Sequence, residues 1–199
     1  MLDAKREKFK NIEKLVAKIF SFFPFTPNQY TAATILFALL SFFFLFKKKI
    51  LIAILFFLLA SFLDFVDGAV ARYKKKATKI GAYFDTIADR FVEGILLLGI
   101  LFLDLPDVIF KSYIWIFLIL FGSLMTTYAK AAAKEKDLVV EELKGGILAR
   151  GERLFLILFS LILSLFNPYF CVYLLIIIAI LTNFTAVQRI CFAVKKSKK

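Results

Sequence analysis

Acidic residues gather in two consecutive apolar stretches of this sequence. Asp64 and Asp67 are three residues apart in one stretch, and Asp85, Asp89 and Glu93 follow in the next at steps of four. On α-helices these spacings place the members of each group on one face. Carboxylates that converge in an apolar medium repel one another strongly unless cations neutralise them. The pattern therefore predicts bound cations, because isolated charges would be costly there.

The residue types present limit both the ion and the reaction. Oxygen ligands without cysteine or histidine favour a hard cation, Mg²⁺ or else Mn²⁺ or Ca²⁺. Enough carboxylates are present for two ions, an arrangement suited to in-line phosphoryl displacement. The sequence contains no histidine, so any proton transfer must fall to a carboxylate or another group. The alternatives are structural: Asp64 could cap a helix, and Asp89 could pair with Arg90.

Long apolar runs recur along the chain and predict an all-α integral membrane protein. Hydrophobic residues make up 61% of the sequence, and a helix needs about 20 apolar residues to cross a bilayer. Six transmembrane helices are predicted, at residues 30–46, 50–70, 80–103, 108–131, 153–166 and 169–187. The second and third are joined by a short basic link, so we expect them to be antiparallel neighbours whose acidic ends face each other.

The N-terminal residues 1–23 differ from the rest because charged residues interrupt the apolar ones. The apolar residues recur at helical spacing: Phe9, Ile12, Leu15, Val16, Ile19 and Phe20. That pattern predicts an amphipathic helix lying in the membrane interface. Pro24 and Pro27 then break the chain. We therefore expect a juxtamembrane amphipathic helix at 1–23, followed by one six-helix membrane domain at 24–199.

The basic residues set the predicted orientation. The chain carries a net charge of +12, and 22 of its 27 Lys and Arg fall on the side of the two termini if six spans are drawn. The positive-inside rule then places both termini and the acidic helix ends on the cytoplasmic side of the cell membrane. A positive charge can also indicate nucleic-acid binding. No soluble basic domain lies between the apolar runs, so no nucleic-acid partner is expected.

A motif at the acidic residues resembles that of a known family. Residues 64–89 read D-F-V-D-G-A-V-A-R, eight residues, then G-A-Y-F-D-T-I-A-D. This is similar to the signature of the CDP-alcohol phosphotransferases, D-x2-D-G-x2-A-R-x8-G-x3-D-x3-D, with every specified position matched. Pro27, Asn28 and Thr31 resemble the P-N-x2-T element before the first span of that family. The likeness covers nearly the whole chain and implies a six-helix membrane transferase.

The resemblance implies a role for each matched residue. Asp64, Asp67, Asp85 and Asp89 would be the metal ligands, for two Mg²⁺ ions or possible Mn²⁺ substitutes, and Asp89 would also be the base that activates the acceptor hydroxyl. The residues implied to bind the CDP-lipid are Asn28, Thr31, Asp64, Gly68, Ala71, Arg72 and Gly81. Small residues permit close approach of a ligand, and an arginine suits phosphate oxygens. Glu93 lies outside the motif, so a structural pairing is favoured for it.

Basic residues at the ends of the last three predicted spans bear on the acceptor: Lys130, Arg150, Arg153 and Arg189. One interpretation is that each of these residues only anchors a helix end at the lipid headgroups. Together they would form a cationic pocket for a phosphorylated acceptor. The segments around them resemble the phosphatidylinositol-phosphate synthases and their archaeal counterparts, the archaetidylinositol phosphate synthases. That likeness implies inositol phosphate as acceptor, CDP-archaeol or CDP-diacylglycerol as lipid donor, and a homodimer.

Other interpretations stay open at this point. The same chemistry with glycerol 3-phosphate, glycerol 1-phosphate or serine as acceptor is the nearest alternative. A cation transporter is more distant, since acidic residues within spans also mark ion pathways. Against it, the acidic residues gather at one end of their spans instead of crossing the bilayer.

Overall fold

The computed structural model describes residues 6–74, 78–139 and 146–197, with side chains from residue 13 to residue 196 outside the gaps. Residues 1–5 of the predicted N-terminal helix and residues 75–77 of the basic link therefore lie outside the described part. Regular structure in the described residues is entirely helical, as predicted. The helices are α1 (Arg6–Ser21), α2 (Pro27–Phe46), α3 (Ile50–Tyr73), α4 (Lys79–Ile100), α5 (Ser112–Glu135), α6 (Arg150–Ser164) and α7 (Pro168–Ser197).

Local chemistry fixes the starts of the two helices that border the site. Thr26 caps α2, where its backbone N–H donates to Gln29 Oε1 at 2.7 Å and its hydroxyl accepts from Gln29 N at 3.4 Å. Pro27 follows at the first helical position, where a missing N–H costs nothing. Thr78 caps α4 by accepting a hydrogen bond from Gly81 N at 3.0 Å. Both starts are thus encoded by a threonine that satisfies exposed backbone donors.

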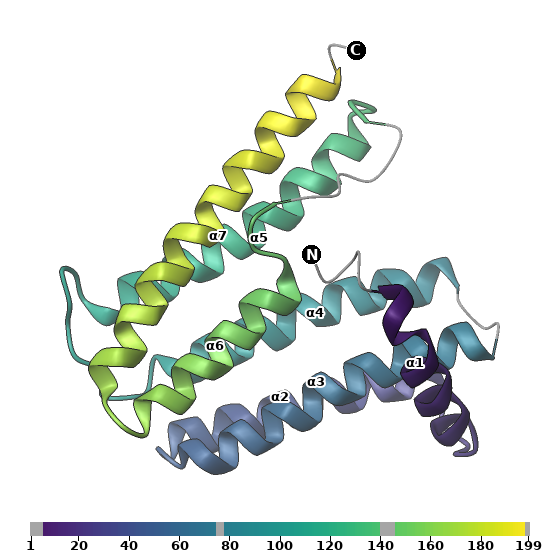
Figure 1. The fold of residues 1–199 in the computed structure, drawn as a ribbon, viewed down its shortest axis with the longest axis horizontal. Helices are drawn as coiled ribbons and strands as arrows, with labels where there is room; N and C mark the ends of the chain where they lie inside the picture. Colours follow the sequence, from purple (N-terminus) through teal and green to yellow (C-terminus); the bar gives the residue numbers. More distant parts are fainter. Residues whose placement is uncertain (1–5, 75–77, 140–145, 198–199) are drawn as a thin grey trace.

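The helices form two groups, α1 to α4 and α5 to α7, which meet where α4 contacts α5 and where α3 contacts α6 (Figure 1). Helix α2 packs closely against both α3 and α4, while α5 and α7 run side by side and α6 packs against α7. Among the described residues, α3 and α4 have almost no close backbone contact with each other. The two helices expected to be antiparallel neighbours therefore do not pack directly on each other, because α2 lies against both and holds them together. Their acidic side chains still reach one another across this separation.

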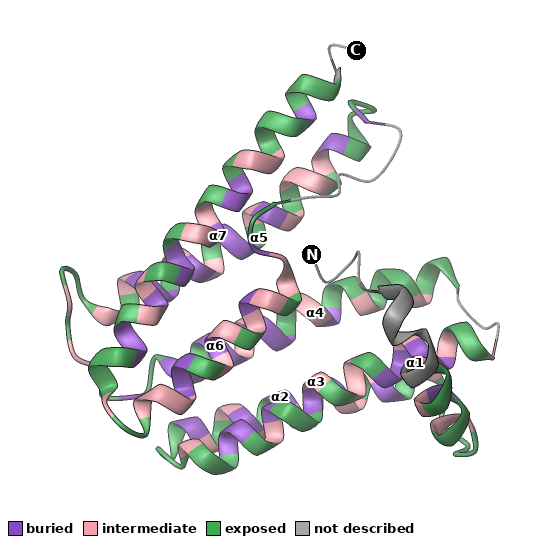
Figure 2. Cartoon of the chain, in the orientation of Figure 1, coloured by how far each residue is buried: buried purple, intermediate pink, exposed green. Residues whose placement is uncertain are grey.

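Within the described residues, four helices are long and apolar enough to cross a membrane: α2, α3, α5 and α7. Helix α4 matches the third predicted span but carries Asp85, Asp89, Arg90 and Glu93, and α6 has 15 residues. Many large apolar side chains are exposed along the helices, where Figure 2 shows the exposed residues in green. Exposed apolar side chains on this scale require a lipid environment. The chain is a multi-pass membrane protein.

The interior combines apolar packing with short polar contacts. Leu45, Phe57 and Leu96 lie in one buried cluster that extends through the helices. Ser41 on α2 donates to the carbonyl of Ala53 on α3 at 2.8 Å. Such hydrogen bonds satisfy hydroxyls away from water and fix the positions of helices along one another. The helix ends that carry the acidic residues are held by this scaffold.

Candidate active site

Three carboxylates converge between α3 and α4. Asp64, Asp85 and Asp89 each offer an oxygen, and these oxygens all lie within 4.8 Å of one another. Asp85 and Asp89 lie one turn apart on α4, so the helix itself presents them together. Asp64 comes from α3, which the packing of both helices against α2 brings into reach. Three oxygen donors at this spacing fit a hard divalent cation.

Arg150, at the first turn of α6, contacts two of the three carboxylates. Its Nη1 lies 2.5 Å from Asp89 Oδ1 and 3.3 Å from Asp64 Oδ2. The contact with Asp89 is an ion pair without good hydrogen-bond alignment, since Asp89 Oδ1 has no hydrogen-bond partner among the described residues. Glu152 caps the same turn by accepting from Ala149 N at 2.9 Å. Arg150 therefore reduces the repulsion between the carboxylates and joins α6 to the site.

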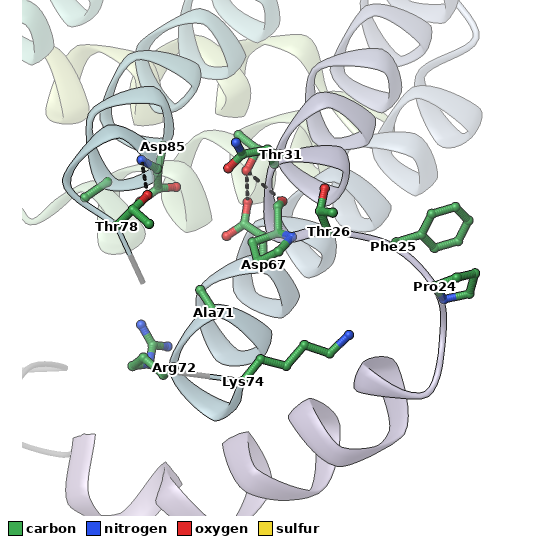
Figure 3. Close-up of a pocket in the computed structure, with 15 residues that line it drawn as sticks. Pro24, Phe25, Thr26, Thr31, Asp67, Ala71, Arg72, Lys74, Thr78 and Asp85 are labelled. Carbon is green, nitrogen blue, oxygen red and sulfur yellow. Dashed lines mark hydrogen bonds between the residues drawn. The ribbon is translucent and has the colours of Figure 1, made fainter. Parts of the chain in front are cut away.

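Asp67, the fourth predicted metal ligand, lies outside this group of three. It is 4% exposed, and its Oδ2 accepts a hydrogen bond from Thr31 Oγ1 at 2.7 Å. Thr31 comes from α2, so the pair links the two predicted motifs, one before the first span and one at the end of α3. Figure 3 shows this hydrogen bond at the wall of a pocket. The role of Asp67 as a metal ligand stays a prediction.

A pocket of about 530 Å³ opens beside Asp67 and Asp85. It contains six of the seven residues predicted to bind the CDP-lipid: Asn28, Thr31, Gly68, Ala71, Arg72 and Gly81. Asp64, the seventh, lies in the carboxylate group. The walls come from the segment before α2, the end of α3 and the start of α4 (Figure 3). Residues 67–72 at the end of α3 and residues 81–85 at the start of α4 thus contribute to a common cavity together with residues 28 and 31.

The glycines of the motif keep this pocket open. A side-chain carbon at Gly81 would lie 3.1 Å from Thr78 Oγ1 and 3.6 Å from Asn28 Oδ1. One at Gly68 would lie 3.2 Å from Nη1 of Arg72. Any larger residue would therefore displace the polar groups that line the pocket. This contact explains in physical terms why small residues recur in the motif.

Sequence reasoning missed several residues that line the pocket: Pro24, Phe25, Thr26, Lys74, Thr78 and Ala82. Thr78 had a local signal, because a threonine before a helical run is a typical N-cap. Lys74 belongs to the basic link, and in the sequence its charge was interpreted only as a sign of membrane orientation. Phe25 had no signal, because its place depends on how the chain turns between α1 and α2.

The four predicted acceptor-binding residues occupy different environments. Arg150 lies at the carboxylates, and Arg189 on α7 donates to the carbonyl of Thr126 at 3.1 Å. Lys130 is partly exposed on α5. Arg153 is 2% exposed and is held by Glu93. Arg189 lies close enough to Arg153 for their charges to interact.

Glu93 and Arg153 form a buried ion pair between α4 and α6. Arg153 Nε donates to Glu93 Oε1 at 2.5 Å, and Nη2 donates to Oε2 at 2.9 Å. Ser123 on α5 completes the network by donating to Glu93 Oε2 at 2.7 Å and accepting from Nη2 at 2.8 Å. The structural pairing predicted for Glu93 is confirmed. Arg153 Nη1 keeps no hydrogen-bond partner among the described residues, so one donor is left for another group.

Arg90 is a further basic residue here, which the sequence analysis named only as an alternative partner of Asp89. Its Nε and Nη1 are buried without a hydrogen-bond partner in the described part of the chain, and Asp89 is 3.9 Å from Nη1. The ion pair between Asp89 and Arg90, predicted as an alternative, is therefore present only at the long distance of 3.9 Å. The closer partner of Asp89 is Arg150.

Comparison with known sequences adds to this geometry. A family profile described as CDP-alcohol phosphatidyltransferase matches residues 25–188. The archaetidylinositol phosphate synthase of Pyrococcus horikoshii is 34% identical over 205 residues, which cover 98% of this chain and 98% of that protein. The bifunctional IPC transferase and DIPP synthase of Aquifex aeolicus is 33% identical over 177 residues, 86% of this chain. The chain spans about 40% of the length of that second relative.

Solved structures show a similar fold. The phosphatidylinositol phosphate synthase of Mycobacterium tuberculosis with CDP-DAG bound has a TM-score of 0.80 and 23% identity, covering 92% of this chain and 94% of that chain. The same synthase in complex with manganese and citrate has a TM-score of 0.76 and 25% identity, covering 91% and 88%. The matched residues 25–188 contain the three carboxylates, Arg153 and all residues that line the pocket except Pro24.

Proposed function

Because the chain belongs to the CDP-alcohol phosphatidyltransferase family, we propose that it transfers a phosphatidyl or archaetidyl group from a CDP-lipid to a hydroxyl of inositol phosphate, releasing CMP. The observation that carries this proposal is the pocket that joins the two sequence motifs beside converging carboxylates. Relatives named as archaetidylinositol phosphate and phosphatidylinositol phosphate synthases support the acceptor.

The metal site is proposed to hold Mg²⁺, with Mn²⁺ as a substitute. Asp64, Asp85 and Asp89 offer three converging oxygens, and Asp67 lies on the pocket side of the same group. Four carboxylates suffice for two ions, and manganese in a similar structure supports divalent metal use. Bound divalent ions would neutralise the diphosphate and make CMP a competent leaving group.

The pocket residues are proposed to bind the cytidine nucleotide and its diphosphate. Asn28 and Thr31 approach from α2, Gly68 and Ala71 leave room at the end of α3, and Arg72 offers a guanidinium. An arginine binds phosphate oxygens through two parallel N–H groups. The lipid tails would extend from the diphosphate into the apolar groove between α3 and α6. This groove begins at Asp64 and is lined by Phe57, Leu154 and Leu158.

Asp89 is the proposed base. Its carboxylate takes the proton of the acceptor hydroxyl, whose oxygen then forms a bond to the phosphorus that carries the lipid. The bond from that phosphorus to the CMP oxygen breaks, and its electron pair leaves with CMP. Arg150, Arg153, Arg189 and Lys130 are the proposed ligands of the acceptor's phosphate; Arg150 lies at Asp89, and Arg153 keeps Nη1 without a partner among the described residues. Arg150 also holds Asp89 beside Asp64.

The proposed arrangement in the membrane has six spans, with α4 and α6 crossing beside the four more apolar helices. Both termini, the pocket and the carboxylates would then lie on the cytoplasmic side. Residues 1–23 would form the interfacial helix and residues 24–199 the membrane domain. We further propose a homodimer, since the family resemblance implies one.

The test is CMP release from a CDP-lipid in detergent with Mg²⁺, with inositol phosphate, glycerol phosphate, serine and free inositol supplied separately. We expect release with inositol phosphate alone. Asp89→Asn should lower the rate about 10²–10⁴-fold, the range for loss of a general base. Asp104→Asn, at an exposed site on the opposite helix ends, is the matched control and should keep full activity. Release with another acceptor would overturn the acceptor assignment, and release from Asp89→Asn at the wild-type rate would overturn the role of Asp89.

A further inference from the structure

Arg72, the last specified residue before the basic link, contacts the N-terminal helix. Its Nε donates to Glu13 Oε1 at 2.6 Å, and the two side chains are 52% and 22% exposed. Glu13 lies on α1, outside the matched family region of residues 25–188. Neither the motif nor the family match therefore gives Glu13 a role. The contact joins a motif residue of the pocket to a helix that the sequence predicted to lie in the membrane interface.

Helix α1 is docked firmly enough for Glu13 to have a defined position. Glu13, Val16, Ala17 and Phe20 follow at helical spacing on one face. Ala17 is 2% exposed, and Val16 and Phe20 pack against a buried cluster that includes α3 residues. The hydroxyl of Tyr30 donates to the carbonyl of Phe20 at 3.0 Å. Glu13 lies on the same face that packs on α3, next to Arg72.

The way in which Glu13 holds Arg72 leaves the rest of the guanidinium for a ligand. Glu13 uses Nε, while Nη1 and Nη2 lie over Gly68, where a side-chain carbon would be only 3.2 Å and 3.3 Å from them. Gly68 and Arg72 both line the pocket, and Figure 3 shows Arg72 with Ala71 and Lys74 at the end of α3. Two parallel N–H groups at Nη1 and Nη2 suit phosphate oxygens.

We propose that Glu13 is a positioning residue, which holds Arg72 through Nε so that its terminal N–H groups face the diphosphate of the CDP-lipid. This inference rests on the proposed function, because it takes Arg72 as a diphosphate ligand. Helix α1 then has a part in binding the donor substrate, besides covering the interface. The effect should be confined to the donor, since Glu13 contacts neither the carboxylates nor the basic residues of α5, α6 and α7 among its described contacts.

The test compares Glu13→Ala and Glu13→Gln with the wild-type protein in detergent with Mg²⁺. The dissociation constant of CDP-diacylglycerol is measured without any acceptor, and the KM of both substrates and kcat are measured by CMP release. We expect Glu13→Ala to raise the dissociation constant and the donor KM about threefold to tenfold, as fits a partly exposed charged hydrogen bond. Glu13→Gln should have a smaller effect, because its amide oxygen still accepts from Nε. The kcat and the acceptor KM should stay unchanged.

Two comparisons make the result specific. In an Arg72→Lys background, which removes Nε, Glu13→Ala should cause no further loss of donor affinity. Glu135→Gln, an exposed glutamate paired with Lys136 on α5, is the matched control and should behave as wild type. Unchanged donor affinity in Glu13→Ala, or an equal loss in the Arg72→Lys background, would overturn the proposal. A wild-type protein that does not bind CDP-diacylglycerol at all would instead overturn the proposed function.

Discussion

Individual residues divide the charges of this protein into two kinds. Glu93 and Arg153 are 1% and 2% exposed and neutralise each other through two hydrogen bonds. Asp64, Asp85 and Asp89 instead present several negative charges to one small space, with Arg150 as a partial counterion. Paired charges of the first kind maintain the fold, whereas the excess of acid in the second kind calls for a cation.

The buried pair gives a stability prediction. Glu93→Gln should destabilise the protein by about 3–5 kcal/mol, because it leaves the Arg153 charge buried without compensation. Unfolding in mixed detergent, followed by circular dichroism, measures this. Glu135→Gln, at an exposed site, should cost less than about 1 kcal/mol. The double change Glu93→Leu with Arg153→Met should recover much of the loss, and a double variant no more stable than Glu93→Gln would contradict this account.

The converging carboxylates give a metal-binding prediction. Asp64→Asn and Asp85→Asn should each weaken Mn²⁺ binding at least about tenfold, because each removes one of three charged oxygen ligands. Electron paramagnetic resonance of free Mn²⁺ measures binding without any substrate. Asp107→Asn is the control, since Asp107 is paired with Lys111 in the loop before α5. Equal affinity in all three variants would mean that the carboxylate group is not the metal site.

Whole helices are positioned by close contacts at small residues. Helix α2 packs against both α3 and α4 and so holds their acidic ends near each other. Helix α5 packs on α7, and Gly122 of α5 contacts Asn183 of α7. Asn183 Nδ2 donates to the carbonyls of Leu118 on α5 and Ala179 on α7, both within 2.9 Å. Small residues and side-chain amides at such contacts are typical of helix association in lipid. The α5–α7 pair in turn carries Lys130 and Arg189.

Gly122 gives a prediction for this helix pair. A side-chain carbon there would lie 3.0 Å from the backbone nitrogen of Asn183, which cannot rotate away. Gly122→Ala should therefore destabilise the protein by about 1–3 kcal/mol through overpacking. Gly151→Ala on α6 meets no atom within 4 Å and should be neutral or slightly stabilising, because alanine favours helix. Thermal unfolding of both variants in detergent compares them, and equal stability would contradict the close packing of α5 on α7.

The molecule as a whole places its polar chemistry at one end of an apolar bundle. The carboxylates and the pocket lie where α3 ends and α4 begins, while the loops at the other ends of these helices carry Lys47 and Asp104. If six spans are drawn, most of the basic residues in the sequence fall on the same side as the site. A membrane enzyme acting on a soluble phosphorylated acceptor needs this arrangement, since acceptor and CMP must exchange with water.

Orientation can be tested by labelling single cysteines. In a Cys191→Ser background, Lys47→Cys should react with a membrane-impermeant maleimide on intact cells, whereas Lys136→Cys should react only after permeabilisation. Both lysines are exposed on opposite ends of the bundle, and Cys171 is buried. The reverse pattern would place the site outside the cell. Labelling of both positions on intact cells would contradict the transmembrane arrangement itself.

The sequence by itself determined the membrane class, most helix limits within a few residues and the acidic motif, although α7 continues to Ser197, beyond the predicted end at residue 187. These features are local: apolar runs set the helices, threonine and proline set their starts, and spacings of three and four set which carboxylates share a face. For the same reason the spacing of Asp85 and Asp89 is enough to place them together on one helix face. Eight residues of the pocket, Asp67 and Asp85 among them, are also recognisable in the sequence, because the motif resemblance joins segments that local periodicity cannot join.

Only the tertiary structure decided which residues from different helices meet. It placed α2 against both α3 and α4, buried Arg153 on Glu93, brought Arg150 to Asp64 and Asp89, and set Glu13 on Arg72. A basic residue at the end of a predicted span looks the same in sequence whether it is buried, bridging or exposed. The choice depends on the helix packed against it, and helix packing arises from contacts between residues far apart in the chain.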